Sequence, residues 1–246
     1  MKLKKIKNAF LFVLTLALVS AAAVAITYAL GTSMGTAENT FTSEPNIDVE
    51  ISELDFDNST GHGETPHPND YVLGQEKALK YYPAAIIPKN PKLTNTSPAS
   101  NDEWVAMTVE YQVKIGTTWY TYPGYSEFKS ALASVQTSGT NEFNTTNWEE
   151  KTGSNGKVFY YKSKLAKDGN TATLFNNVII NSTFTMSGTN YVITYYNEGS
   201  AATANVSTLP DFRINLKGYA VSADTIPSYG DDSKGALDAL IGSTNK

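Results

Sequence analysis

The sequence predicts an all-β protein, an antiparallel β-sandwich or jelly roll with one or two short helices in its loops. Three observations carry this prediction. Many short segments alternate apolar with polar residues, and turns rich in Gly, Asn and Ser separate them. No helical pattern is long enough for the crossovers of a parallel sheet. The 246 residues, of which 41% are hydrophobic, are enough for one sizeable core.

The clearest strand covers residues 104–115, where every second side chain is apolar over twelve residues. Residues 119–122 are predicted to pair with it as a hairpin that turns at Gly116. Alternation or a short apolar run predicts further strands at 47–51, 158–161, 174–180, 184–186 and 191–196.

The last predicted strands are 212–216 and 219–223. The apolar residues fall on even positions before Gly218 and on odd positions after it. A change of phase at a glycine is typical of a β-bulge or a bend, so we expect one at Gly218.

Two segments carry apolar residues at helical spacing, 126–135 after a Pro-Gly pair and 235–241 near the end. We expect both to be short helices. The polar, turn-rich segments 55–80 and 137–156 are expected to be surface loops.

The first thirty residues predict export. Four lysines precede a charge-free run over 9–30, and Thr27-Tyr28-Ala29 offers signal peptidase a cleavage site after Ala29. We therefore expect residues 1–29 to be a signal peptide and 30–246 to form one secreted domain. The run is also long enough to span a bilayer, so an uncleaved anchor is the alternative and would be the chain's one contact with a membrane.

Composition excludes several classes of function. The chain has no cysteine, which removes disulfides, thiolate nucleophiles and cysteine-based metal sites. Four of the 19 basic residues lie in the leader, so the secreted part has 15 basic against 24 acidic residues. This acidic balance predicts that nucleic acid is not a partner.

Three stretches resemble one group of exported proteins. They are 27–54, with the cleavage site and the strand after it; 82–109, with Lys89-Asn90-Pro91 before a strand; and the closing strand 212–224, with Tyr219-Ala220-Val221. Together and in this order they are similar to the TasA/camelysin family, whose leaders are cleaved by a signal peptidase of the SipW type. The chain departs from that pattern just after Ala29 and at Ser222.

The resemblance implies a jelly-roll-like β-sandwich and a structural role at the cell surface or in the biofilm matrix. The expected partners are other copies in a fibre, other matrix proteins and the SipW-type peptidase. The segment after the cleavage site has few apolar anchors, Leu30, Met34 and Phe41. An extended terminus of this kind can add as a strand to a neighbouring sheet, so we expect it to be the assembly strand.

His62, Glu64 and His67 are the one local cluster of metal-ligating residue types. Camelysin is regarded as a metalloprotease, so a camelysin-like surface metallopeptidase is the alternative function. The helical zinc motif, however, needs histidines four apart, whereas these are five apart and Gly63 and Pro66 oppose helix. Incidental binding of a divalent metal and a solvated loop are the other interpretations, and no other cofactor is expected.

A glycan- or ligand-binding surface module is the third hypothesis. The aromatic run Trp119, Tyr120, Tyr122 and Tyr125 would supply a flat platform for a sugar. Packing in the core or on a sheet face is the more common use of such a run.

Overall fold

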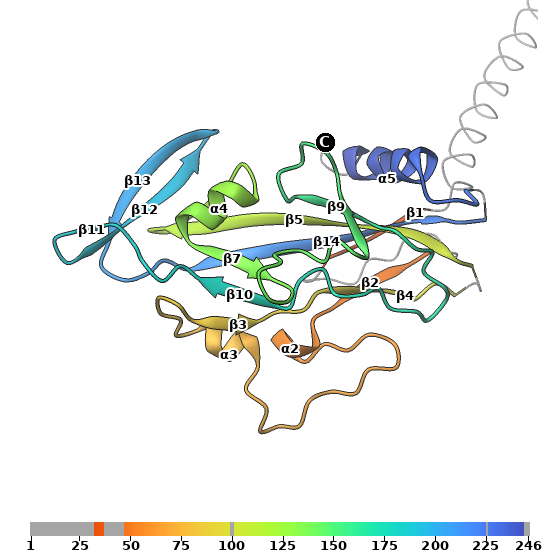
Figure 1. Ribbon diagram of the computed structural model, residues 1–246, viewed down its shortest axis with the longest axis horizontal. Coiled ribbons are helices and arrows are strands. Elements are labelled where there is room, and N and C mark those ends of the chain that lie inside the picture. Colours follow the sequence, from red (N-terminus) through yellow and green to blue (C-terminus); the bar gives the residue numbers. More distant parts are fainter. Residues whose placement is uncertain (1–31, 37–46, 99–100, 225, 244–246) are drawn as a thin grey trace, which may run out of the picture.

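The structure is a computed structural model and describes residues 32–36, 47–98, 101–224 and 226–243, with the backbone alone for 32–36. The largest sheet is built around two long neighbouring strands, which run side by side through the molecule (Figure 1). Its strand order is β1 (Thr32–Thr36), β14 (Phe212–Ser222), β5 (Glu103–Ile115), β9 (Val158–Tyr161) and β8 (Trp148–Glu150), with β6 (Thr118–Thr121) also paired to β5.

Three smaller sheets complete the strands, and every pairing between named strands is antiparallel. They are β3 (Ile86–Pro88), β10 (Asn177–Ile180) and β7 (Ala133–Gln136); β2 (Val49–Ser52) and β4 (Lys92–Asn95); and β11 (Met186–Ser187), β12 (Asn190–Asn197) and β13 (Ser200–Val206). The predicted all-β sandwich class is confirmed.

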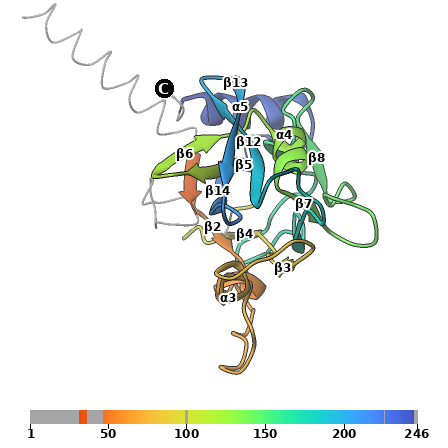
Figure 2. The same cartoon turned by 90° about the vertical axis from the view of Figure 1, so that its left-hand side faces the viewer.

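Short helices cover the ends and outer faces of the sheets. They are α2 (Leu54–Asp57), α3 (Gly74–Ala78), α4 (Tyr125–Ala131) and α5 (Asp231–Ser243). Figure 2 shows α5 on one side of the layered strands and α3 on the opposite side. None of the helices in the described part of the chain is long and apolar enough to cross a membrane.

Both predicted helices exist with different bounds. The first ends at Ala131, because Ala133 and Val135 are buried in alternation and pair as β7 with β10. The second is longer than predicted, since polar residues at 231–234 form its first turn. The predicted loops 55–80 and 137–156 contain α2, α3 and β8 in addition to turns.

Two apolar clusters hold the layers together. The larger contains Leu93, Met107, Val109 and Phe175 and lies on the inner face of the main sheet. The smaller contains Trp104, Tyr219, Val221 and Leu237, and it joins the outer face of the same sheet to α5. One end of the main sheet is therefore buried on both faces.

The predicted β-bulge at Gly218 is wrong. β14 pairs with β5 without interruption, from Phe212 opposite Val113 to Ser222 opposite Glu103. The apolar residues change phase because the strand buries its inner face first and then, under α5, its outer face as well. Gly218 is needed for close packing, since a Cβ there would lie 2.7 Å from Cδ2 of Leu93.

The N-terminal strand is the edge of the main sheet. β1 pairs with β14 over 217–221, with Met34 opposite Tyr219 and Thr36 opposite Lys217. The predicted signal peptide with Ala29, and the predicted anchors Leu30 and Phe41, lie outside the described residues. Residues 32–36 belong to the segment predicted to drive assembly. In this structure they form an edge strand of the main sheet of the same chain.

Candidate functional site

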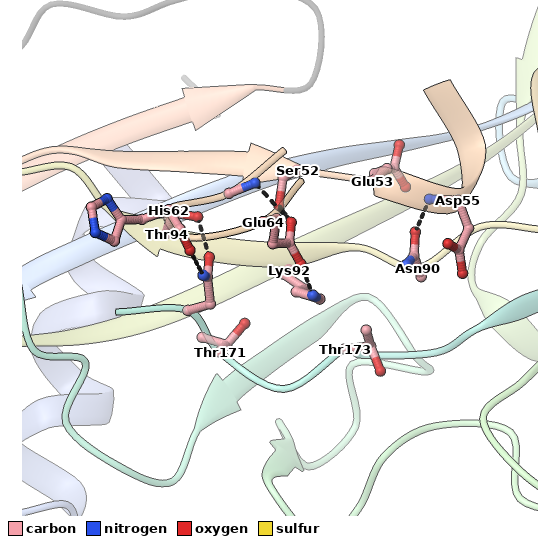
Figure 3. A network of polar contacts seen from close by, with 12 residues as sticks. Ser52, Glu53, Asp55, His62, Glu64, Asn90, Lys92, Thr94, Thr171 and Thr173 are labelled. Carbon is pink, nitrogen blue, oxygen red and sulfur yellow. Dashed lines mark hydrogen bonds and ion pairs between the residues drawn. The ribbon is translucent and has the colours of Figure 1, made fainter. Parts of the chain in front are cut away.

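A network of polar contacts joins the segment after α2 to β4 and its neighbours (Figure 3). This segment carries the predicted metal ligands. Short helix α2 ends at Asp57, and the left-handed φ of 66° at the C-cap residue Asn58 turns the chain outward. The Glu64 side chain then reaches back to β4, and the backbone carbonyl of His62 to the loop near Asn170.

Glu64 is held at one end of this network. Its carboxylate forms an ion pair with Lys92 of β4. It also accepts hydrogen bonds from the Gly61 amide at 2.7 Å and from the Ser52 hydroxyl at 3.4 Å. The negative charge is thus paired within the chain.

His62 points toward a different partner. Its side chain is 59% exposed, and Nδ1 lies 3.9 Å from Oδ1 of Asp168. The His62 carbonyl accepts a hydrogen bond of 2.6 Å from the Asn170 amide group, and Asn170 in turn accepts one from the Thr94 hydroxyl at 2.5 Å. The backbone of His62 is therefore fixed to β4, whereas its imidazole faces solvent.

His67 is bound on the other side of the loop. Its Nε2 lies 2.8 Å from Oδ1 of Asp55 in α2, and its ring stacks on Tyr71 with centroids 3.8 Å apart. The His67 amide donates to Oδ1 of Asn58 at 2.7 Å. The imidazole thereby ties the far side of the loop to the helix.

The three predicted metal ligands do not converge on one point, since each contacts a different partner. Over the described ranges no group of three or more His, Asp or Glu side chains is placed to hold a metal ion. The contacts of this network have a clear structural consequence: they fasten a long polar segment to the sandwich.

Beside the network lies a buried ion pair that sequence reasoning missed. Lys89 Nζ is 2.7 Å from Oε2 of Glu53, and both side chains are less than a tenth exposed. The ammonium also lies 4.2 Å from the centroid of the Phe56 ring. Burial raises the pKa of Glu53, and the charge of Lys89 opposes that rise. A lysine just before a strand gave no sequence signal that it would be buried.

A second buried carboxyl has no cation beside it among the residues that the structure describes. Glu103 is the first residue of β5 and is fully buried. The Ser97 hydroxyl donates to its Oε1, while Oε2 has no hydrogen-bond partner among the described residues. Burial raises the pKa of Glu103 to about 8, against an opposing effect of the Ser97 hydrogen bond. In the sequence Glu103 is one acidic residue among many, with no spacing that singles it out.

The aromatic run predicted as a glycan platform is divided among different environments. Tyr122 and Tyr125 are buried, and the Tyr122 hydroxyl donates to the Thr194 carbonyl at 2.8 Å. Tyr120 packs on Tyr195 with centroids 4.6 Å apart. Trp119 is half-buried, with the guanidinium of Arg213 4.3 Å from the centroid of its ring. Core packing is thus the role of the two buried tyrosines.

The comparisons with known proteins give no family for this chain. No protein-family model matches it, and neither a curated protein nor a solved structure is similar to it.

Proposed function

We propose that this protein is an exported structural protein of the cell surface or biofilm matrix, whose copies join by exchanging strand β1. The observation that carries the proposal is the edge position of β1. This strand lies near the start of the chain, is five residues long and has no charged residue. It pairs with β14 on one edge. The predicted cleavage site lies directly before it, and the resemblance to TasA-like fibre subunits agrees with this role.

Strand exchange needs no new kind of contact. The backbone groups that β14 offers to its own β1 can accept the same strand from a neighbouring copy. Each copy would then donate a strand at one end and accept one along β14. Such a contact is head-to-tail, so repetition produces a filament unless the rotation closes a ring.

The first test removes the strand. The chain that begins at Leu30 is expected to polymerise, whereas a chain that begins at Phe41 lacks β1 and is expected to stay monomeric. Light scattering and electron microscopy of the two purified proteins distinguish these outcomes. If both stay monomeric at high concentration, or both polymerise equally, β1 is not the connector.

A matched pair of proline variants sharpens this test. Bonds of 2.8 Å from the Lys114 amide to the Asp211 carbonyl, and of 2.9 Å from the Ala223 amide to the Asp102 carbonyl, fix the alternation along β14. Odd-numbered residues therefore bond to β5 and even-numbered ones face β1. Ser33, opposite Ala220, bonds to β14, whereas the backbone groups of Met34 point away. Ser33→Pro should abolish filaments and Met34→Pro should leave them, because proline removes one amide donor.

A further inference from the structure

Strand β13 is the outer edge of the three-stranded sheet β11–β12–β13. It pairs with β12 from Ser200 opposite Asn197 to Val206 opposite Tyr191, and no strand in the described ranges pairs with its second edge. β12 packs against β6 and α4, and Figure 1 shows the β12–β13 hairpin at one end of the molecule, with β13 farther from β5 than β12 is. β13 is thus joined to the sandwich chiefly through β12.

The hydrogen bonds of β12 show which backbone groups of the hairpin point outward. The Val192 amide donates to the Thr185 carbonyl at 2.8 Å, and the Thr194 carbonyl accepts a bond of 2.8 Å from the Tyr122 hydroxyl. Even-numbered residues of β12 therefore bond on the side away from β13, and odd-numbered ones bond to β13.

On β13 the outward backbone groups belong to Ala201, Thr203 and Asn205. Each of them lies opposite an even-numbered residue of β12, so its amide and carbonyl point to the second edge. The side chains of these three residues are exposed as well. The strand has seven residues without a charge or a proline, two devices that commonly prevent pairing at an exposed edge. This edge is therefore a template for another strand.

We propose that β13 pairs with β13 of a second copy, antiparallel and about a two-fold axis at Thr203. In this register Thr203 faces its own counterpart, and Ala201 of one copy faces Asn205 of the other. All the outward backbone groups of the strand are used, because each of these pairs exchanges both of its hydrogen bonds. A slip by two residues would leave one outward residue of each β13 without a partner. Threonine opposite threonine is also a favourable pair across two strands.

The distribution of charge favours a second copy as the partner at this edge. Residues 30–246 have 15 basic against 24 acidic side chains, so two copies repel each other unless the surfaces that meet are uncharged. β13 provides such a surface. Glu198, in the turn before the strand, is the nearest acidic residue along the chain. The two copies of Glu198 would lie at opposite ends of the contact, roughly 34 Å apart, where salt screens their repulsion.

The contact closes on itself and is independent of strand exchange. It is isologous, so it gives a dimer in which the sheets of the two copies join into one. The paired surface is small, and we therefore expect a weak, reversible dimer. β1 pairs with β14 in a different sheet, so either contact can form without the other. Failure of the one would leave the other in place.

Single cysteines test the register, because the natural chain has none. Residues in a bonded antiparallel pair have Cα atoms about 5.5 Å apart, which suits a disulfide. Thr203→Cys should therefore give a cross-linked dimer on mild oxidation of the chain that begins at Leu30, below the concentration at which filaments form. Ala201→Cys is the control, because it is exposed on the same edge but its counterpart would lie about 14 Å away. We expect cross-linking to be about tenfold slower in the control, as measured by non-reducing gel electrophoresis.

A double variant confirms the pairing from the other direction. Ala201→Cys combined with Asn205→Cys should recover rapid cross-linking, because each cysteine of one copy faces the other cysteine of its partner. Within one chain the two positions lie about 14 Å apart, too far for an internal disulfide. Equal rates for Thr203→Cys and Ala201→Cys would mean that the copies meet by random collision, and would overturn the proposal.

Amide hydrogen exchange of the unchanged chain gives a readout that needs no cysteine. The amides of Ala201, Thr203 and Asn205 should become protected as the protein concentration rises. Those of Ala202 and Ala204 should be protected at every concentration, because they bond to β12. Protection of all five at every concentration would mean that the chain covers its own edge, and would overturn the proposal. Outward amides that stay unprotected at high concentration would overturn it as well.

Discussion

The two halves of β14 have opposite surroundings although they belong to one uninterrupted strand. Residues 218–221 are buried on both faces, and β5 and β1 pair with their two edges. Residues 212–216 bury their inner face alone, and Arg213 and Asn215 stand half-exposed on the outer face. The difference comes from the two ends of the chain, because β1 supplies the edge and α5 the outer cover of the second half.

This contrast predicts where along the strand the folding free energy is concentrated. Burial on both faces removes more apolar area from water per residue, so the second half is expected to carry more of the folding free energy. The first half has no described strand on its second edge, and its outer face has polar side chains. Changes in α5 should therefore lower stability more than changes to the outer-face side chains of the first half.

The largest expected effect is that of Leu237→Ala. Leu237 is 1% exposed and packs in the cluster that covers the second half of β14. Truncation of a buried leucine leaves a cavity and typically lowers the free energy of unfolding by about 2–5 kcal/mol. Urea denaturation of the purified protein measures this loss.

Gly235→Ala is the matched control on the same helix. A Cβ at Gly235 meets no atom within 4 Å, and alanine favours helix over glycine by about 1 kcal/mol. The control should keep or raise the stability. If Leu237→Ala unfolds at the same urea concentration as the unchanged protein, α5 does not anchor the second half.

The fold class could be predicted from the sequence because the alternation of apolar and polar residues is a local signal. β5, β6, β9 and β12 lie where alternate apolar residues or short apolar runs predicted strands. β13 was missed because its sequence from Ser200 has mostly small and polar residues, and it is held by pairing with β12. The phase change at Gly218 was misread, since the cover on the outer face comes from a helix at the far end of the chain.

The site was less predictable than the fold, because its contacts join residues that are far apart in the sequence. The polar nature of the His62–His67 segment is visible in the sequence, but its partners Lys92, Asp168 and Asn170 come from distant positions. Burial of Glu53 and Glu103 likewise depends on contacts made across the sandwich. Composition cannot distinguish such groups from acidic residues on the surface.

The second prediction concerns pH and the far end of the stable half, where Glu103 lies opposite Ser222. Burial raises the pKa of Glu103 from 4.5 to about 8 in the folded state. Below pH 4.5 the group is protonated in both states. Between about pH 4.5 and 8 the unfolded chain alone ionises it, so stability falls as pH rises, by at most about 1.4 kcal/mol per pH unit.

Glu103→Gln removes this titration. Urea denaturation at pH 5 and at pH 8 should give a smaller loss of stability for the variant than for the unchanged protein. Glu50→Gln, on the exposed side of β2, is the control and should follow the unchanged protein. Equal losses in Glu103→Gln and the unchanged protein would mean that Glu103 is ionised in the folded state at both pH values.

The smallest expected effect belongs to the first half of β14. Arg213 donates from Nε to Oε1 of Gln112 at 2.5 Å, and its guanidinium lies 4.3 Å from the centroid of the Trp119 ring. A half-exposed cation–π contact contributes about 0.5–1 kcal/mol, so Arg213→Met should lower the free energy of unfolding by that amount at a protein concentration where single copies dominate. Lys114→Met is the control, because its ammonium lies 5.9 Å from the same ring and should matter less. Thermal and urea denaturation of the two variants, measured side by side, test whether Arg213→Met loses more stability than Lys114→Met. A loss for Arg213→Met as large as that for Leu237→Ala would contradict the expectation that the second half of β14 carries more of the folding free energy.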